Sequence, residues 1–145
     1  MTGVQTCALP IYWVIAILVF FLVDLLIVLW VVFRRRMPGL RQDQLNYIHS
    51  HWVIIIDGFG SNPKQGILDA DKLLDYAMSK KGFEGSLGEK LKKGGKRSFS
   101  DVNGVWRAHK LRNKVAHELG DIDRGEAKIA LRNFKKALND LGAGL

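Results

Sequence analysis

Apolar residues are distributed unevenly, and their pattern divides the chain into two parts. From Tyr12 to Phe33 every residue except Asp24 is apolar or aromatic. As a helix this run reaches roughly 33 Å, about the thickness of the hydrocarbon core of a bilayer. The pattern therefore predicts a transmembrane helix over residues 12–33. A cleaved secretory signal would instead show a basic leading region, a shorter apolar core and a small-residue cleavage site.

After a break at Met37-Pro38-Gly39, apolar residues recur at spacings of three and four, which is typical of amphipathic helices. This periodicity predicts helices over residues 41–57, 63–81, 101–119 and 123–141. Asn62 and Pro63 suit the N-cap and the first position of the second of these helices. No alternating strand pattern is found, so the sequence predicts an all-α fold, with one N-terminal transmembrane helix followed by a four- to five-helix bundle.

Residues 82–100 interrupt the helical pattern, because glycine and lysine dominate them. We expect a mobile loop here, with one short amphipathic turn around Leu87 to Leu91. The segment carries a basic cluster that either is a solvated surface or binds RNA or anionic lipid headgroups. The members of this basic cluster are Lys90, Lys92, Lys93, Lys96 and Arg97.

These elements define four segments of the chain. They are an N-terminal stretch over residues 1–11, the span over residues 12–33, a basic juxtamembrane hinge over residues 34–40 and a helical domain over residues 41–145. The first segment is set apart because Thr2 to Ile11 resembles translated sequencing-adaptor read-through. A natural extracytoplasmic tail is the alternative. The last segment is long enough for one hydrophobic core.

Charge predicts how the chain is oriented in the membrane. All 22 lysines and arginines lie at or after Arg34 together with 13 of the 14 acids, so this part carries a net charge of +9. Arg34, Arg35 and Arg36 follow the span directly and no lysine or arginine precedes it. The positive-inside bias therefore predicts a single-pass protein of the cell membrane, in contact with membrane lipid, with its N-terminus outside and its C-terminal domain in the cytoplasm.

Asp24 lies near the middle of the predicted span. A charged side chain there costs about 2.5 to 3.5 kcal/mol, which the surrounding apolar residues outweigh. Either Asp24 contacts another membrane helix or a second copy of the chain, or it is a protonated acid that an otherwise strong span tolerates.

The sequence predicts no metal site and no cofactor. Cys7 is the single cysteine, so the chain can form neither an intramolecular disulfide nor a cysteine metal cluster. His49 and His51 would lie about 200° apart around a helix and cannot share a metal ion.

Three polar residues lie on or beside the packing face of the helix predicted over residues 101–119. Arg112 is near the centre of the apolar arc, and Asn113 and His117 follow at about 100° and 140° from it. A guanidinium in this position requires an acid, a phosphate or a water-filled cleft, because burying it alone is costly. Acids that could pair with it are Asp69, Asp71 and Asp75.

These residues resemble the signature of the HEPN superfamily, in which an arginine, often followed by asparagine, precedes a histidine by a short spacing. Arg112-Asn113 and His117 match it, with four residues between the arginine and the histidine. The stretch from Asp71 to Glu118 is also similar to a group of HEPN-related bacterial domains, through Lys72-Leu73-Leu74-Asp75, Gly85 to Leu91 and His109 to Asn113. The resemblance implies a dimerising helical bundle in which two copies of the motif face one cleft.

Two function hypotheses follow from this resemblance. In the first, the chain is a membrane-tethered interaction domain that dimerises, or binds a partner protein or a nucleotide, through the face bearing Arg112 and His117. In the second, it is a metal-independent endoribonuclease of a defence or toxin system. There His117 would exchange protons with the RNA, Arg112 would stabilise charge on the phosphate and Asn113 would orient that phosphate.

Overall fold

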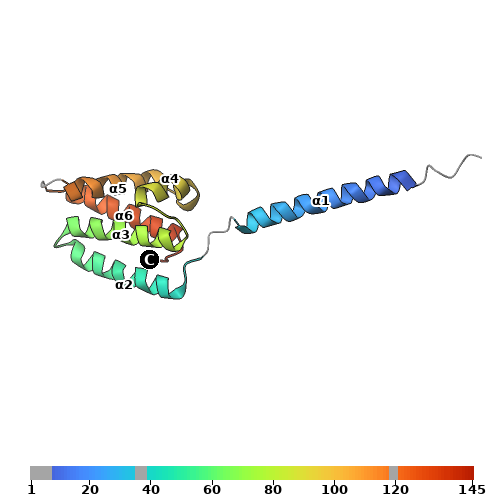
Figure 1. Ribbon diagram of the computed structural model, residues 1–145. Helices are drawn as coiled ribbons and strands as arrows, with labels where there is room; N and C mark the ends of the chain where they lie inside the picture. The colour runs from blue at the N-terminus through green and yellow to red at the C-terminus, as the bar shows by residue number, and fades with distance from the viewer. Residues whose placement is uncertain (1–7, 35–38, 118–120) are drawn as a thin grey trace, which may run out of the picture. The chain divides into compact units, whose positions relative to one another are not determined.

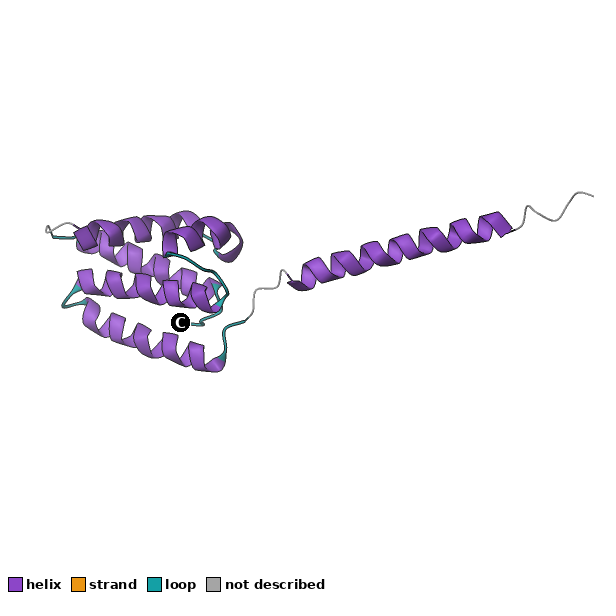
Figure 2. Cartoon of the chain, in the orientation of Figure 1, coloured by secondary structure: helices purple, strands orange, loops and turns teal. Residues whose placement is uncertain are grey.

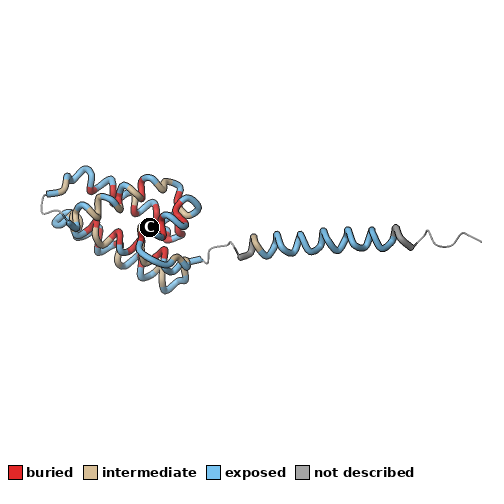
Figure 3. Tube along the Cα trace, turned by 45° about the horizontal axis from the view of Figure 1, so that its top comes forward, coloured by how far each residue is buried: buried red, intermediate tan, exposed pale blue. Residues whose placement is uncertain are grey.

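The computed structural model describes residues 8–34, 39–117 and 121–145. The chain divides into two compact units, Met1–Met37 and Pro38–Leu145 (Figure 1). The described part of the first unit is helix α1, Ala8–Arg34. Within α1, the stretch Ile11–Val31 is long and apolar enough to cross a membrane, with a mean hydropathy of 3.1. All its side chains from Ile11 to Trp30 are exposed, Asp24 among them (Figure 3).

The second unit is a bundle of five helices, and no strand occurs among the residues described (Figure 2). The helices are α2 (Gln42–Phe59), α3 (Pro63–Lys80), α4 (Leu87–Ser98), α5 (Val102–His117) and α6 (Arg124–Asp140). The predicted all-α fold is therefore confirmed. Four of the five helices begin and end within two residues of their predicted bounds, because their apolar stripes are regular.

Helix α3 is the centre of the bundle and contacts each of the other four helices. Its start is fixed by Asn62, whose side chain accepts a hydrogen bond from the backbone N–H of Gln65 at 3.1 Å, with Pro63 as the first helical residue. Ile67, Leu74 and Met78 of α3 are completely buried. Because this helix contacts all the others, a polar side chain on its buried face has to find a partner on a neighbouring helix.

The prediction of a mobile loop over residues 82–100 is wrong for residues 87–98, which form α4. Ser86 caps this helix in a capping box with Glu89, whose carboxylate accepts from the Ser86 backbone N–H at 2.7 Å. Leu87 and Leu91 are buried against the rest of the bundle. The cap and these contacts offset the poor helix propensity of the two adjacent glycines.

Those two glycines, Gly94 and Gly95, are buried because they lie where other side chains approach the α4 backbone closely. A Cβ atom on Gly94 would overlap the ring of Phe83, and one on Gly95 would lie 2.8 Å from Val102 Cγ2. Glycine in this segment therefore allows close packing. Composition alone predicts a flexible loop for the same residues.

Candidate functional site

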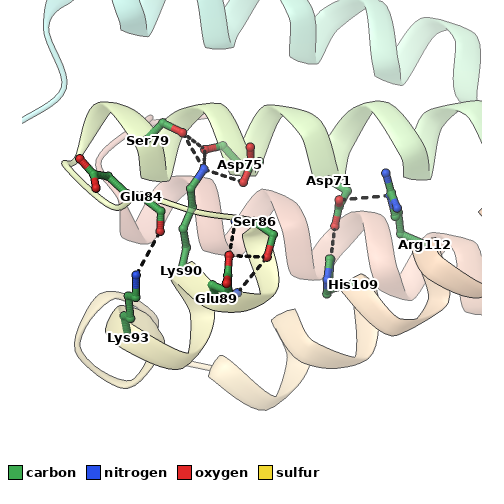
Figure 4. Close-up of polar contacts among 10 residues, drawn as sticks. All are labelled: Asp71, Asp75, Ser79, Glu84, Ser86, Glu89, Lys90, Lys93, His109 and Arg112. Atoms are coloured by element: carbon green, nitrogen blue, oxygen red, sulfur yellow. Dashed lines mark hydrogen bonds and ion pairs between the residues drawn. The ribbon is translucent and has the colours of Figure 1, made fainter.

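The polar groups of α3 and α5 meet at Asp71, an acid that is only 4% exposed. His109 Nδ1 lies 2.7 Å from Asp71 Oδ1, and Arg112 Nε lies 3.3 Å from Asp71 Oδ2 (Figure 4). One buried carboxylate on α3 thus holds two side chains of α5. Such a charge is tolerated inside a domain only when it is paired in this way.

The hydrogen bonds around His109 indicate where its proton lies. The Asp71 carboxylate can only accept, so His109 Nδ1 carries the hydrogen that it shares with this carboxylate. On the other side of the ring, the Asn113 amide nitrogen Nδ2 lies 3.4 Å from His109 Nε2. With Asn113 as the donor, Nε2 is the acceptor, and Asp71 and Asn113 together orient the ring.

Arg112 is anchored but not fully enclosed. Its Nη1 donates to Asn113 Oδ1 at 3.0 Å, and 29% of its side chain is exposed. Its Nε is buried and lies within ion-pair distance of Asp71, yet the alignment does not make a hydrogen bond. The guanidinium therefore keeps donor capacity that Asp71 and Asn113 do not use.

These side chains line a pocket of about 380 Å³ between α3, α5 and the start of α4. The lining residues are Asp71, Lys72, Asp75, Ser86, Leu87, Gly88, His109, Arg112 and Asn113. The first N–H groups of a helix have no acceptor within the helix and form its positive end. At the start of α4 the carboxylate of Glu89 offsets this positive end. The hydrogen-bond donors of this pocket, which we call the Arg112 pocket, are therefore those of its side chains.

Glu89 lies in the first turn of α4 and completes the capping box with Ser86. Its pKa is lowered, first by the hydrogen bond from the Ser86 backbone N–H and then by that from the Ser86 hydroxyl. This carboxylate therefore stays ionised over a wide pH range and keeps the α4 end of the Arg112 pocket in place.

His117 is not part of the Arg112 pocket. It is exposed at the end of α5, and it forms no hydrogen bond or ion pair with the described residues. Among the described residues of one copy, Arg112 and His117 therefore do not share the expected crevice. The reason is angular, because His117 lies about 140° from Arg112 around the helix, whereas His109 lies about 60° from it.

The sequence prediction missed His109 as a member of the site and left Asp71 as one of three acids that could pair with Arg112. A signal for His109 was present, since His109, Arg112 and Asn113 follow one another at the i, i+3 and i+4 positions of one helix face. This face needs an acid from another helix, and Asp71 was one of three acids that the sequence offered. Only the tertiary packing of α5 on α3 identifies it.

The predicted basic cluster loses one member in the structure. Lys90 is buried, and its Nζ donates to Asp75 Oδ1 at 2.7 Å and to Ser79 Oγ at 2.6 Å (Figure 4). This lysine ties α4 to α3 and is not a surface cation for RNA or lipid. The other four members remain exposed: Lys92, Lys93, Lys96 and Arg97.

The predicted membrane residues are only partly described. Asp24 is exposed on α1, and Arg34 is the last residue of that helix. Arg35 and Arg36 lie outside the described residues. No group of three or more His, Cys, Asp or Glu side chains suited to a metal ion occurs in the part of the chain that the structure describes.

Comparisons with protein-family models, with curated proteins and with solved structures give no significant match to this chain. The chemistry of the Arg112 pocket therefore has to be argued from its own geometry.

Proposed function

We propose that this chain is a membrane-anchored helical interaction domain that binds a phosphate-bearing ligand, of the nucleotide class, in the Arg112 pocket. The proposal keeps the HEPN-like character that Arg112-Asn113 suggests, together with self-association. It also includes a single-pass anchor in the cell membrane with the N-terminus outside, which is supported by the apolar helix Ile11–Val31 and the arginines after it.

The observation that carries the proposal is the partly exposed guanidinium of Arg112 in a polar pocket. A planar guanidinium with unused N–H groups matches phosphate oxygens better than any other side chain does. Of the lining charges, Asp75 is paired with Lys90, and Lys72 is paired with Asp69 at 3.5 Å, which leaves Arg112 beside Asp71. These charges balance, so the unused N–H groups of Arg112 are what supports phosphate binding, and the volume of about 380 Å³ falls within the range of small-ligand pockets.

Calorimetric titration of the full chain in nanodiscs with AMP and with inorganic pyrophosphate tests this proposal. We expect saturable binding that Arg112→Lys weakens about tenfold, because a lysine keeps the charge but not the paired donors. The matched control is Arg107→Lys, on the same helix with a side chain that is 67% exposed, and it should change the affinity less than about twofold. Absence of saturable binding, or equal weakening by both variants, would refute the proposal.

A second function, metal-independent RNA cleavage, is favoured by the pairing of Asp71 with His109. A carboxylate that holds Nδ1 of an imidazole leaves Nε2 to act as a base, which is an arrangement used in general acid–base catalysis, and Nε2 of His109 makes only a long contact of 3.4 Å with Asn113. In this version His109 takes the proton-transfer role that the sequence motif gives to His117, and Arg112 stabilises the phosphate.

RNA mixed with the full chain under EDTA distinguishes the two histidines. Under the second function, cleavage is lost in His109→Ala and retained in His117→Ala. The reverse result would support the arrangement expected from the motif. Intact RNA at high protein concentration would exclude this second function and leave ligand binding alone.

A further inference from the structure

Outside α1, large apolar side chains are exposed on only two of the described helices. Helix α2 exposes Tyr47, Val53, Ile54 and Ile56, which are 42% to 66% exposed, and α6 exposes Ile129, which is 52% exposed. Exposed apolar groups gathered on one element of a water-facing domain commonly mark a contact surface. The two surfaces differ in charge, and this difference suggests what each one binds.

The first surface is the outer face of α2, which we define by its four exposed apolar residues and Asp57. Helix α2 turns Ile48, Trp52 and Ile55 toward the core, and α3 is the one helix that it packs against extensively. No lysine or arginine occurs from residue 42 to residue 63. Of the two acids on α2, Asp43 pairs with Arg41 at 3.2 Å, whereas Asp57 forms no ion pair with the described residues. The α2 outer face is therefore apolar and slightly acidic.

The second surface is a groove of about 500 Å³ between α5 and α6. Ala108, Leu111 and Ala130 contribute apolar lining, and Ile129 lies at its α6 side. The remaining lining residues are Arg107, Lys110, Lys114, Glu126 and Asn133. Arg107 pairs with Asp101 at 3.8 Å, which leaves Lys110 and Lys114 against Glu126, so this α5/α6 groove is apolar and basic.

We infer that the α2 outer face of one copy docks into the α5/α6 groove of a second copy. A helix with exposed apolar side chains is the kind of occupant that an apolar groove between helices accepts. Charge favours this pairing. Two grooves facing each other would bring the excess lysines of both together, and two α2 faces would bring two Asp57 carboxylates together. The mixed pairing instead places Asp57 against the lysines of the groove.

A contact between two different faces has a consequence for assembly. Such a head-to-tail interface leaves one free groove and one free α2 face on every pair, so copies continue to add until a ring closes or a chain forms. The contact is separate from the Arg112 pocket and shares with the proposed function only the expectation of self-association. It does not use the Arg112 and His117 face named by the sequence motif.

Cysteine crosslinking in membranes tests this inference. In a Cys7→Ser background, which removes the one native thiol, Val53→Cys and Ile129→Cys are placed on separately tagged copies and expressed together. We expect a mixed crosslinked pair with a short bismaleimide, and none when either variant is expressed alone. A chain carrying both substitutions should give a ladder longer than two copies. Lys135→Cys on the exposed side of α6 serves as the control for random collision.

Charge exchange provides the second arm of the test. Asp57→Lys or Lys110→Glu should each lower the mixed crosslink about fivefold, and the two together, one on each tagged copy, should restore it. Thermal unfolding by circular dichroism checks that each variant is folded. Crosslinking by Val53→Cys alone, or a mixed yield no higher than that of the control, would overturn the inference. Neither result depends on whether the Arg112 pocket binds a nucleotide.

Discussion

At the scale of single residues, the Arg112 pocket depends on one buried carboxylate. Asp71 faces His109 at 2.7 Å and Arg112 at 3.3 Å, and its own side chain is only 6% exposed. The carboxylate fixes the tautomer of the histidine and anchors the arginine while leaving part of its guanidinium exposed. Stability and the proposed ligand binding therefore depend on the same side chain.

Replacing this acid should be costly. Asp71→Asn removes the negative charge between two groups that are mostly shielded from water, and we expect the free energy of unfolding to fall by about 3 kcal/mol. His117→Ala is the control, because His117 is exposed and unpaired among the described residues, and it should change stability by less than about 0.5 kcal/mol. Urea unfolding followed by tryptophan fluorescence measures both. Similar stabilities for the two variants would show that Asp71 does not hold the site together.

Sequence reasoning identified part of this site. That Arg112 lies toward the packing face follows from its position in the apolar arc of α5, and its contact with Asp71 agrees with this expectation. The sequence did not identify the histidine of the site correctly. The motif spacing points to His117, whereas the structure places His109 beside Asp71, on the same side of α5 as Arg112. The burial of Lys90 could not be predicted from its own segment either, because its partner Asp75 lies on another helix. Such pairings are tertiary and leave no local pattern.

At the scale of elements, α4 is the helix that amino-acid composition failed to predict. Regular apolar stripes predicted α2, α3, α5 and α6. The glycines and lysines of α4 are typical of a loop, although this helix has a complete capping box. Gly94 and Gly95 reduce the intrinsic helix propensity of α4 but allow Phe83 and Val102 to approach its backbone. The helix is stable because of what it packs against, which a window of sequence does not reveal.

Alanine at two helical glycines separates packing from propensity. In Gly94→Ala the new methyl group would overlap the Phe83 ring, and we expect a loss of about 1 to 3 kcal/mol in the free energy of unfolding. In Gly58→Ala on α2 the methyl group meets no atom within 4 Å, so better helix propensity should stabilise the chain by about 0.5 kcal/mol. Thermal and urea unfolding measure these changes. Stabilisation by both variants would mean that α4 does not pack closely against Phe83.

At the scale of the whole molecule, a helix with the length and apolarity of a membrane span is joined to a bundle that has its own core. The apolar residues of that core lie between Ile48 and Ala143, outside α1. The bundle carries nearly all of the charge of the chain, and three arginines follow the span. This asymmetry is the basis for the proposed orientation, because cations next to a span are retained in the cytoplasm.

The single native cysteine makes the orientation measurable. Cys7 precedes the span, so in intact cells it should react with a membrane-impermeant maleimide. A chain with Cys7→Ser and Lys135→Cys should react only after the cells are opened, since Lys135 lies on the bundle. Labelling of the second variant but not the first in intact cells would invert the proposed topology.

Ligand binding beside Arg112 and His109 is the central proposal, and the four histidine rings of the chain report on it directly. Nitrogen-resolved NMR of the imidazole rings, recorded while the full chain in nanodiscs is titrated with AMP, follows each histidine separately. The account predicts a saturable shift of the His109 Nε2 signal, with the signals of His49, His51 and His117 unchanged. A shift of His117 with His109 unchanged, or no shift of any ring, would contradict it.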